Sequence, residues 1–149
     1  MENKTNIRIC HKLTLSKNHT AMIKLDHTAM YVHDLENMKE FFIRFFSAQA
    51  NQMYHNPQTG LRTYFLTFAD GSRLEIMNRP EVLVRENDIF LQGYTHIAFS
   101  AGSKEAVDDL TRVLGNNGYK VISGPRKTGD GYYESCIQGP ENNLIEITE

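Results

Sequence analysis

The sequence of 149 residues has few cysteines and no concentration of positive charge, and each absence excludes a class of protein. Its two cysteines, Cys10 and Cys136, lie far apart, and neither belongs to a Cys-x-x-Cys arrangement. The sequence therefore predicts neither a disulfide framework nor a thiolate zinc site. Lys and Arg number 16 against 18 Asp and Glu, and no basic run is long enough to follow a phosphate backbone. We expect no nucleic-acid partner.

Long apolar segments are also missing. Charged side chains interrupt the short apolar pieces of residues 1–22, so this stretch does not have the apolar centre of a secretory signal. No segment approaches the length of a membrane span, so we expect no membrane association. With so few cysteines, a reducing cytoplasm is the compartment that fits best.

What the sequence does contain is a repeat. Residues 25–29 (LDHTA) recur as residues 94–98 (YTHIA), and residues 73–77 (RLEIM) recur as residues 143–147 (NLIEI). The two histidines are 69 residues apart and the two glutamates 71 residues apart. A chain of this length holds two small modules that share a core more readily than two independent domains. Each module thus carries one His near its start and one Glu near its end.

The predicted organisation is an α+β fold of two modules, each reading strand, helix, strand, strand, strand. We place an N-terminal extension at residues 1–22, the first module at 23–78, a linker at 79–92 and the second module at 93–149. Asp34 and Ser103 are predicted to cap the two helices. The predicted strands lie at 25–32, 50–54, 62–68 and 73–77, then at 95–100, 119–122, 132–138 and 144–148.

Strand alternation predicts that the repeated His and Glu side chains share the uncovered faces of the sheets. Glu75 and Glu146 each lie between apolar residues whose side chains point the other way, toward the face that a helix covers. His27 is two residues from Ala29, and His96 is two residues from Ala98, so each His shares a strand face with a small alanine. The alanines leave room around each imidazole. If the two sheets curve round a shared axis, both His and both Glu converge in one cleft.

Two neutral imidazoles and two carboxylates suit one divalent ion of borderline character. Zn, Ni and Co are the best candidates, with Fe and Mn as further ones, whereas Ca and Mg prefer all-oxygen sites. The lack of thiolates argues against a closed structural zinc site. A lone His or Glu on a strand is usually an ordinary polar residue, but recurrence at matching positions favours the four-ligand reading. Four protein ligands leave two open positions on a six-coordinate ion, as substrate chemistry requires.

Three other features receive plainer interpretations. The aromatic residues at positions 41, 42, 45 and 46 form part of the core, and Cys136 is expected to be a small buried apolar residue. The glycine-rich stretch 124–131 reads as a hairpin connection. Its Arg126 and Lys127 are also candidates for holding an anionic group of a substrate.

With these motifs, the chain resembles the vicinal oxygen chelate superfamily, which includes glyoxalase I, bleomycin and fosfomycin resistance proteins, methylmalonyl-CoA epimerase and extradiol dioxygenases. The resemblance covers about residues 23–149. It is carried by residues 25–27 (LDH), 73–76 (RLEI), 93–100 (GYTHIAFS) and 143–147 (NLIEI). It implies paired βαβββ modules whose curved sheets form an open barrel around a metal. Many such proteins are homodimers, and the barrel is built within one chain or across two.

Within the superfamily, the His, Glu, His, Glu order is similar to that of glyoxalase I. The implied metal ligands are His27, Glu75, His96 and Glu146. The epimerase typically has Gln at the position of Glu75, and the dioxygenases and fosfomycin enzymes typically use three protein ligands. The implied activity is a lyase or isomerase reaction on a 2-oxoaldehyde hemithioacetal through an enediolate. Glu146 would be the base, and Glu75 would serve in the same role on the opposite face of the substrate.

The residues at the substrate-binding positions of glyoxalase I match that enzyme less well than the metal ligands do. Glyoxalase I usually has an Arg four residues after its first His and an Asn four residues after its first Glu, to hold glutathione. Tyr31 and Arg79 occupy those positions here. The Gly-Pro-x-Lys-x-Gly pattern at 124–129 resembles the flexible loop of that enzyme, which again points to Arg126 and Lys127 for an anionic thiol adduct.

Two further function classes stay open. One is another metalloenzyme of the superfamily, either an epimerase or an Fe(II) dioxygenase. The other is a small-molecule binding protein of the bleomycin-resistance type that sequesters its ligand without turnover. Such binders commonly lack the metal ligands, so the presence of all four favours an enzyme.

Overall fold

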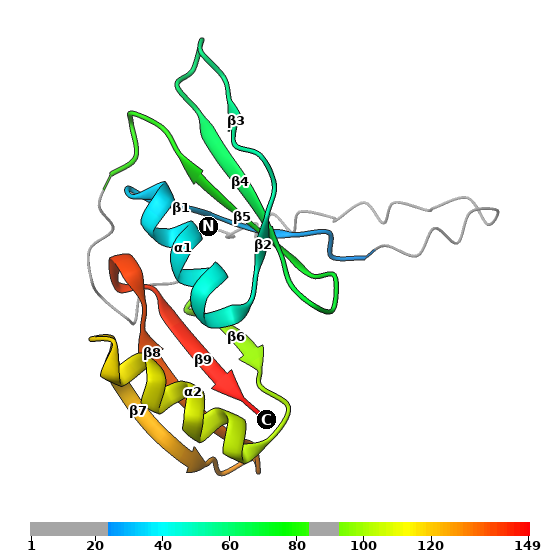
Figure 1. Cartoon of the computed structure of the whole chain (residues 1–149), viewed down its shortest axis with the longest axis vertical. Helices are drawn as coiled ribbons and strands as arrows, with labels where there is room; N and C mark the ends of the chain where they lie inside the picture. Colours follow the sequence, from blue (N-terminus) through cyan, green and yellow to red (C-terminus); the bar gives the residue numbers. More distant parts are fainter. Residues whose placement is uncertain (1–23, 84–92) are drawn as a thin grey trace, which may run out of the picture.

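The computed structural model describes residues 24–83 and 93–149, which form two modules that each contain one sheet and one helix (Figure 1). The first module consists of β1 (Thr28–Tyr31), α1 (Leu35–Phe46), β2 (Gln49–Ala50), β3 (Tyr54–His55), β4 (Arg62–Thr67) and β5 (Arg73–Asn78). The second consists of β6 (His96–Ser100), α2 (Lys104–Asn116), β7 (Lys120–Lys127), β8 (Tyr133–Gln138), the 3-10 turn η1 (Pro140–Asn142) and β9 (Leu144–Thr148). The predicted α+β class is confirmed.

The two sheets have matching strand orders. The order is β1-β5-β4-β2 in the first, with β3 also paired to β4, and β6-β9-β8-β7 in the second. In each module the opening strand runs parallel to the closing strand, and the remaining pairs are antiparallel. The two sheets stay separate, so the described residues do not form a closed barrel.

The predicted capping residues begin both helices. The Asp34 side chain accepts a hydrogen bond from the Asn37 backbone N–H, and the Ser103 side chain accepts one from Ala106. Each bond satisfies one of the N–H groups that a helix leaves without an internal partner. Gly118, just past the end of α2, has φ +89°, a conformation that glycine adopts without steric cost.

One apolar core joins the two modules, and α1 lies at its centre. Phe42 and Phe46 of α1 contact Phe99 of β6, with ring centroids 5.9 and 4.5 Å apart. Phe41 packs edge-on against Tyr119 at 4.9 Å. The predicted core role of the Phe cluster is confirmed. Helix α1 therefore packs against both its own sheet and the second module (Figure 1).

A carboxylate adds a polar connection between the modules. Glu141, in turn η1 of the second module, accepts hydrogen bonds from the backbone N–H groups of His33 and Asp34 at 2.7 to 2.9 Å. These groups lie at the N-terminus of α1, where negative charge is favourable. Arg44 of α1 also donates to the Asn117 side chain at 2.7 Å. The relative placement of the two modules is thus fixed by directional contacts as well as by apolar packing.

Two predicted elements differ from the structure. The predicted strand at 50–54 is two short strands, β2 and β3, which pair with different parts of β4. The predicted connection at 124–131 is only partly a turn, because β7 continues through residue 127 with irregular pairing to β8. Pro125 lacks a backbone N–H, and β7 is an edge strand, where such a residue is tolerated.

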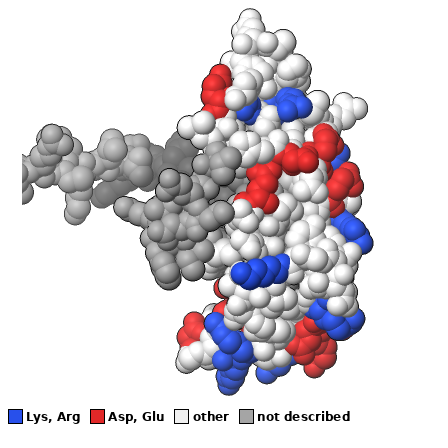
Figure 2. All heavy atoms as spheres, turned by 90° about the vertical axis from the view of Figure 1, so that its left-hand side faces the viewer, with Lys and Arg blue, Asp and Glu red and all other residues white. Residues whose placement is uncertain are grey.

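The surface carries mixed charge. On the face that Figure 2 shows, Lys and Arg side chains are scattered, with Asp and Glu between them. No helix of the described residues is long and apolar enough to cross a membrane. The predicted extension at 1–22 and residues 84–92 of the predicted linker lie outside the described residues, and the module boundaries stay predictions.

Candidate metal centre

The first predicted ligand pair lies on the open face of the first sheet. Glu75 is in register with Ala29 on β1, and strand parity turns its side chain away from the core side chains Leu74 and Ile76. His27, just before β1, comes to the same face, with its Nε2 3.5 Å from Glu75 Oε2. The Glu75 side chain is 17% exposed. The pair is thus partly shielded from water and still open on one side.

The second pair reproduces this geometry. Glu146 on β9 is in register with Ala98 on β6, and His96 Nε2 lies 3.5 Å from Glu146 Oε2. The Glu146 side chain is 23% exposed. Parallel pairing of the opening and closing strands therefore brings His and Glu together in both modules, as the alternation predicted.

The donor spacing fits a shared ion. Two ligand atoms at ordinary metal distances and a tetrahedral angle lie about 3.4 Å apart. The measured 3.5 Å between Nε2 and Oε2 in each pair is close to that value. In each imidazole the other nitrogen, Nδ1, already has a hydrogen-bond partner, which leaves Nε2 for an ion. Each pair is therefore a suitable two-ligand half-site.

The four predicted ligands come together as two pairs and not as one cluster within the chain. Over residues 24–83 and 93–149, no three His, Cys, Asp or Glu side chains are arranged to hold one ion. Two ligands are fewer than the three or four protein ligands of ordinary zinc sites. Neither half-site is complete by itself.

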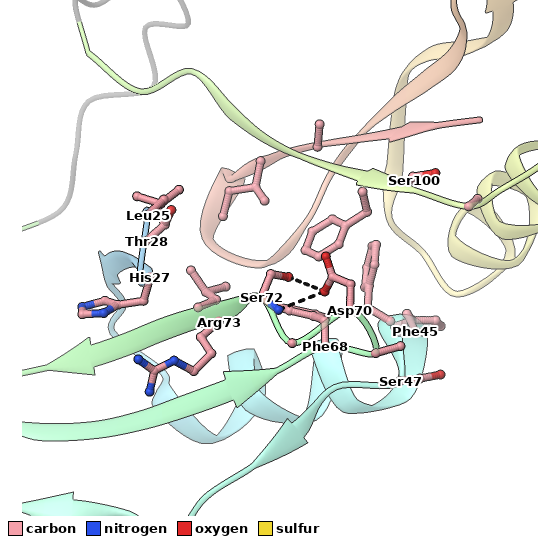
Figure 3. A pocket seen from close by; sticks show the side chains of 18 of the residues that line it. Leu25, His27, Thr28, Phe45, Ser47, Phe68, Asp70, Ser72, Arg73 and Ser100 are labelled. Atoms are coloured by element: carbon pink, nitrogen blue, oxygen red, sulfur yellow. Dashed lines mark hydrogen bonds between the residues drawn. The ribbon is translucent and has the colours of Figure 1, made fainter. Parts of the chain in front are cut away.

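Charged and aromatic side chains surround the first pair. Asp26 Oδ2 lies 2.8 Å from His27 Nδ1 and also accepts a hydrogen bond from Arg73. The hydrogen bond to His27, followed by the charge of Arg73, lowers the pKa of Asp26 below its ordinary value. The His27 ring stands edge-on to Phe65 at 5.2 Å, and the Arg73 guanidinium lies over that ring at 5.0 Å. His27 and Arg73 project to the same side of the first sheet (Figure 3).

A hydroxyl and a thiol are the nearest neighbours of the second pair, and the Arg126–Glu134 ion pair lies further along the same face of β8. Thr95 Oγ1 is 3.0 Å from His96 Nδ1, and Cys136 is in register with Glu146 on the neighbouring strand. The prediction that Cys136 is a small buried residue is wrong, because its thiol is only half-buried and lies on the open face beside Glu146. Partial burial, followed by the charge of Glu146, raises the pKa of Cys136. The thiol therefore stays protonated at neutral pH.

The predicted substrate residues have different surroundings. Tyr31 is exposed at the end of β1, and it lines a cleft of about 710 Å³ that His96 also lines. Arg79 donates to Glu81 at 2.8 Å, and the bond to Glu81, followed by one to Tyr31, raises the pKa of the guanidinium. Arg126 is paired with Glu134 at 3.2 Å. Lys127, the next residue of β7, is exposed.

A second cleft, of about 890 Å³, adjoins His27. It lies between the start of β1, the hairpin of residues 68–74 and β6, and Arg73 lines it (Figure 3). Asp26 is a further lining residue. Sequence reasoning did not single out Asp26, Arg73 or Phe65. The repeat itself held a signal for Asp26, because the residue before each repeated His differs, Asp in one copy and Thr in the other.

Comparison with known proteins identifies the fold family. Residues 24–147 match the sequence profile of the glyoxalase/bleomycin resistance protein/dioxygenase superfamily. An uncharacterised protein of Bacillus subtilis (strain 168), YqjT, is 28% identical over 127 residues, which cover 83% of this chain and 96% of that protein.

Solved structures agree with this match. The crystal structure of a glyoxylase/bleomycin resistance protein/dioxygenase domain from Frankia sp. EAN1pec has a TM-score of 0.73 at 14% identity and covers 86% of this chain and 98% of its own. A V278E mutant of glyoxalase I from Zea mays has a TM-score of 0.68 at 20% identity. The match covers 82% of this chain and 43% of the maize chain. At these identities the likeness concerns the fold.

Proposed function

This chain belongs to the glyoxalase/bleomycin resistance protein/dioxygenase superfamily, and we propose that it is a metal-dependent lyase or isomerase of the glyoxalase I type. Its proposed substrate is the hemithioacetal of a 2-oxoaldehyde and a thiol. The observation that carries the proposal is the pair of His–Glu half-sites, each with its donor atoms 3.5 Å apart on the open face of a sheet. A divalent ion of borderline character, Zn, Ni or Co, with Fe and Mn as further candidates, matches these donors.

We place the ion between two copies of the chain. His27 and Glu75 of one copy would supply two ligands, and His96 and Glu146 of the second copy would supply the other two. Support comes from the described residues of a single chain, which offer each pair no third ligand. Support also comes from the contacts of Glu141 and Arg44, which hold the two modules of one chain in their present arrangement. A symmetric homodimer would contain two such sites.

The side chains around the site have distinct parts in the proposed reaction. A bound divalent ion would polarise two adjacent oxygens of the substrate and make the proton on the neighbouring carbon removable. Glu146 takes that proton and returns it to the adjacent carbon as a general base and acid. Ala29 and Ala98, in register with the two glutamates, leave space for the substrate.

Four residues are proposed to hold the rest of the substrate. Tyr31 and Arg79 are neighbours on the first module and supply a hydroxyl and a cation. Arg126 and Lys127 are cations of β7, although the guanidinium of Arg126 is already paired with Glu134. An anionic thiol adduct matches these cations. The glutathione-binding Arg and Asn of glyoxalase I have no equivalent at Tyr31 and Arg79, so the experiment uses several thiols.

The activity test uses purified full-length protein loaded separately with Ni, Co and Zn. Methylglyoxal is supplied with glutathione or with other low-molecular-weight thiols. Formation of a thioester, seen as a rise in near-ultraviolet absorbance, supports the proposal. Stoichiometric metal without turnover on any thiol contradicts it and favours a binding protein. Absence of metal from protein purified without chelators contradicts every reading that uses a metal.

Complementation tests the placement of the site between two copies. One variant loses His27 and Glu75 to Ala, and the other loses His96 and Glu146 to Ala. Each variant alone should be inactive. When the two variants are co-expressed, about a quarter of all sites should be complete, because half of the dimers are mixed and each mixed dimer has one intact site of its two. A mixture that stays inactive while it forms dimers would contradict the shared site.

A further inference from the structure

We propose that Asp26, held by Arg73, is a positioning residue for His27 and makes the first module the half-site that anchors the metal. The inference rests on the proposed metal site and assigns unequal parts to its two halves. It concerns metal affinity and the protonation of one imidazole nitrogen, which are measured separately from turnover.

The contact between Asp26 and His27 sets which ring nitrogen carries the proton. Asp26 Oδ2 lies 2.8 Å from His27 Nδ1. An ionised carboxylate only accepts hydrogen bonds, so Nδ1 must donate its proton to it. In the neutral imidazole Nε2 then keeps its lone pair, and this atom faces Glu75 Oε2 at 3.5 Å. Asp26 thus selects, of the two neutral forms of His27, the one whose Nε2 can bind a metal ion.

Two further contacts hold this arrangement. Arg73 donates to the same Oδ2 of Asp26, so the carboxylate is fixed from two sides. Phe65 contacts both partners, with the His27 ring edge-on at 5.2 Å and the Arg73 guanidinium 5.0 Å above the ring. Arg73 and Phe65 belong to β5 and β4, so two strands hold the Asp26–His27 pair against the sheet.

The second module lacks these supports at the equivalent positions. Thr95 takes the place of Asp26, and its Oγ1 lies 3.0 Å from His96 Nδ1. A hydroxyl both donates and accepts, so this contact is compatible with either neutral form of His96. Cys136 and Leu144 take the places of Phe65 and Arg73. His96 is therefore oriented less strictly than His27.

The test replaces the residue before each histidine. Asp26→Asn keeps the size of the side chain but adds a donor and removes the charge, and Thr95→Val is the matched change in the second module. Affinity for Ni or Zn is measured by competition with a chelator. The protonated nitrogen of each histidine is read from ¹⁵N chemical shifts of the metal-free protein. Circular dichroism confirms that each variant folds.

We expect Asp26→Asn to lower metal affinity about 10- to 100-fold and Thr95→Val to lower it by about threefold or less. In metal-free wild-type protein His27 should carry its proton on Nδ1, and Asp26→Asn should shift the population toward Nε2. Arg73→Ala should give an intermediate loss of affinity, because Asp26 remains.

Each result decides between the two proposals. Equal affinities for Asp26→Asn and wild type, with metal still bound, would overturn the positioning role and leave the proposed function standing. Equal losses for Asp26→Asn and Thr95→Val would overturn the unequal parts. A wild-type protein that binds no metal would overturn both.

Discussion

The two modules carry the same His–Glu pair at the same register, but they surround it differently. Around His27 and Glu75 stand a carboxylate, a guanidinium and an aromatic ring. The nearest neighbours of His96 and Glu146 are a hydroxyl and a thiol, and the closest charged pair, Arg126 with Glu134, lies further along β8. The distance from imidazole to carboxylate is 3.5 Å in both. The duplication thus kept the donor atoms while their surroundings diverged. In the proposed site, the first half therefore holds the ion more firmly, and the carboxylate of the second half moves the proton.

The largest expected effect tests this division directly. Glu146→Gln should lower kcat about 10²- to 10⁴-fold, because an amide cannot accept the substrate proton. Metal content should largely survive if the first module supplies the firmer ligands, as proposed. Turnover and bound metal are measured on the same preparation.

Glu75→Gln is the matched control in the first module. It should lower metal affinity more, and metal-saturated turnover less, than Glu146→Gln. The opposite order would assign the base to the first module and reverse the comparison.

The ring under His27 offers a second test. Phe65→Ala removes the edge-on contact with His27 and the surface on which Arg73 rests. Aromatic contacts of this kind contribute about 0.5–1.5 kcal/mol, so metal affinity should fall about 2- to 10-fold. Cys136→Ala at the matched position should change affinity little, and chelator competition compares the two. A larger loss for Cys136→Ala would show that the second half-site is the more tightly organised one.

The equivalent turns of the two modules differ in what their carboxylates bind. Asp70, between β4 and β5, accepts bonds from Ser72 within its own turn. Glu141, between β8 and β9, reaches across to the backbone of His33 and Asp34. Glu141→Ala should therefore lower the free energy of unfolding by about 1 kcal/mol or somewhat more. Asp70→Ala should have the smaller effect in urea unfolding. Similar losses for the two variants would mean that Glu141 does not connect the modules in solution.

The sequence predicted the parts of this molecule that depend on local chemistry and on the repeat. The helix caps at Asp34 and Ser103 and the open-face placement of Glu75 and Glu146 follow from side-chain capping and strand alternation, and the structure confirms them. The repeat also located both His–Glu pairs. These features need only residue order and short-range geometry.

Features that depend on distant contacts were missed. Alternation along one strand does not show that Arg73, on β5, bonds to Asp26, which precedes β1. Nor does it show that Glu141 binds the N-terminus of α1, more than a hundred residues earlier in the chain. Cys136 was expected to be buried because cysteine usually is. Its alternation with the buried Ser135 and Ile137 along β8 places its side chain on the open face instead, beside Glu146. The relative placement of the two modules is the largest such feature, because it decides whether the two pairs can share an ion within one chain.

The smallest expected effect concerns a contact between α1 and its own sheet that does not involve the metal ligands. It consists of Glu36, Lys39 and Tyr64. Tyr64 of β4 donates to Glu36 of α1 at 2.8 Å, and Lys39 pairs with the same carboxylate. The bond to Lys39, followed by that to Tyr64, lowers the pKa of Glu36 below its ordinary 4.5.

A lowered carboxyl pKa stabilises the fold above pH 4.5, and this contribution is lost as the pH falls through the folded-state pKa. Because the Glu36 side chain is 59% exposed, the gain is only a few tenths of a kcal/mol. Glu36→Gln should thus be slightly less stable than wild type at pH 7, and urea unfolding at a series of pH values should show this difference shrinking as the pH falls below 4.5. Lys39→Gln removes the largest cause of the lowered Glu36 pKa. The free energy of unfolding of this variant should therefore depend less on pH than that of wild type. A Glu36→Gln difference that does not shrink as the pH falls would mean that this contact depends on the shape of the side chain and not on its charge.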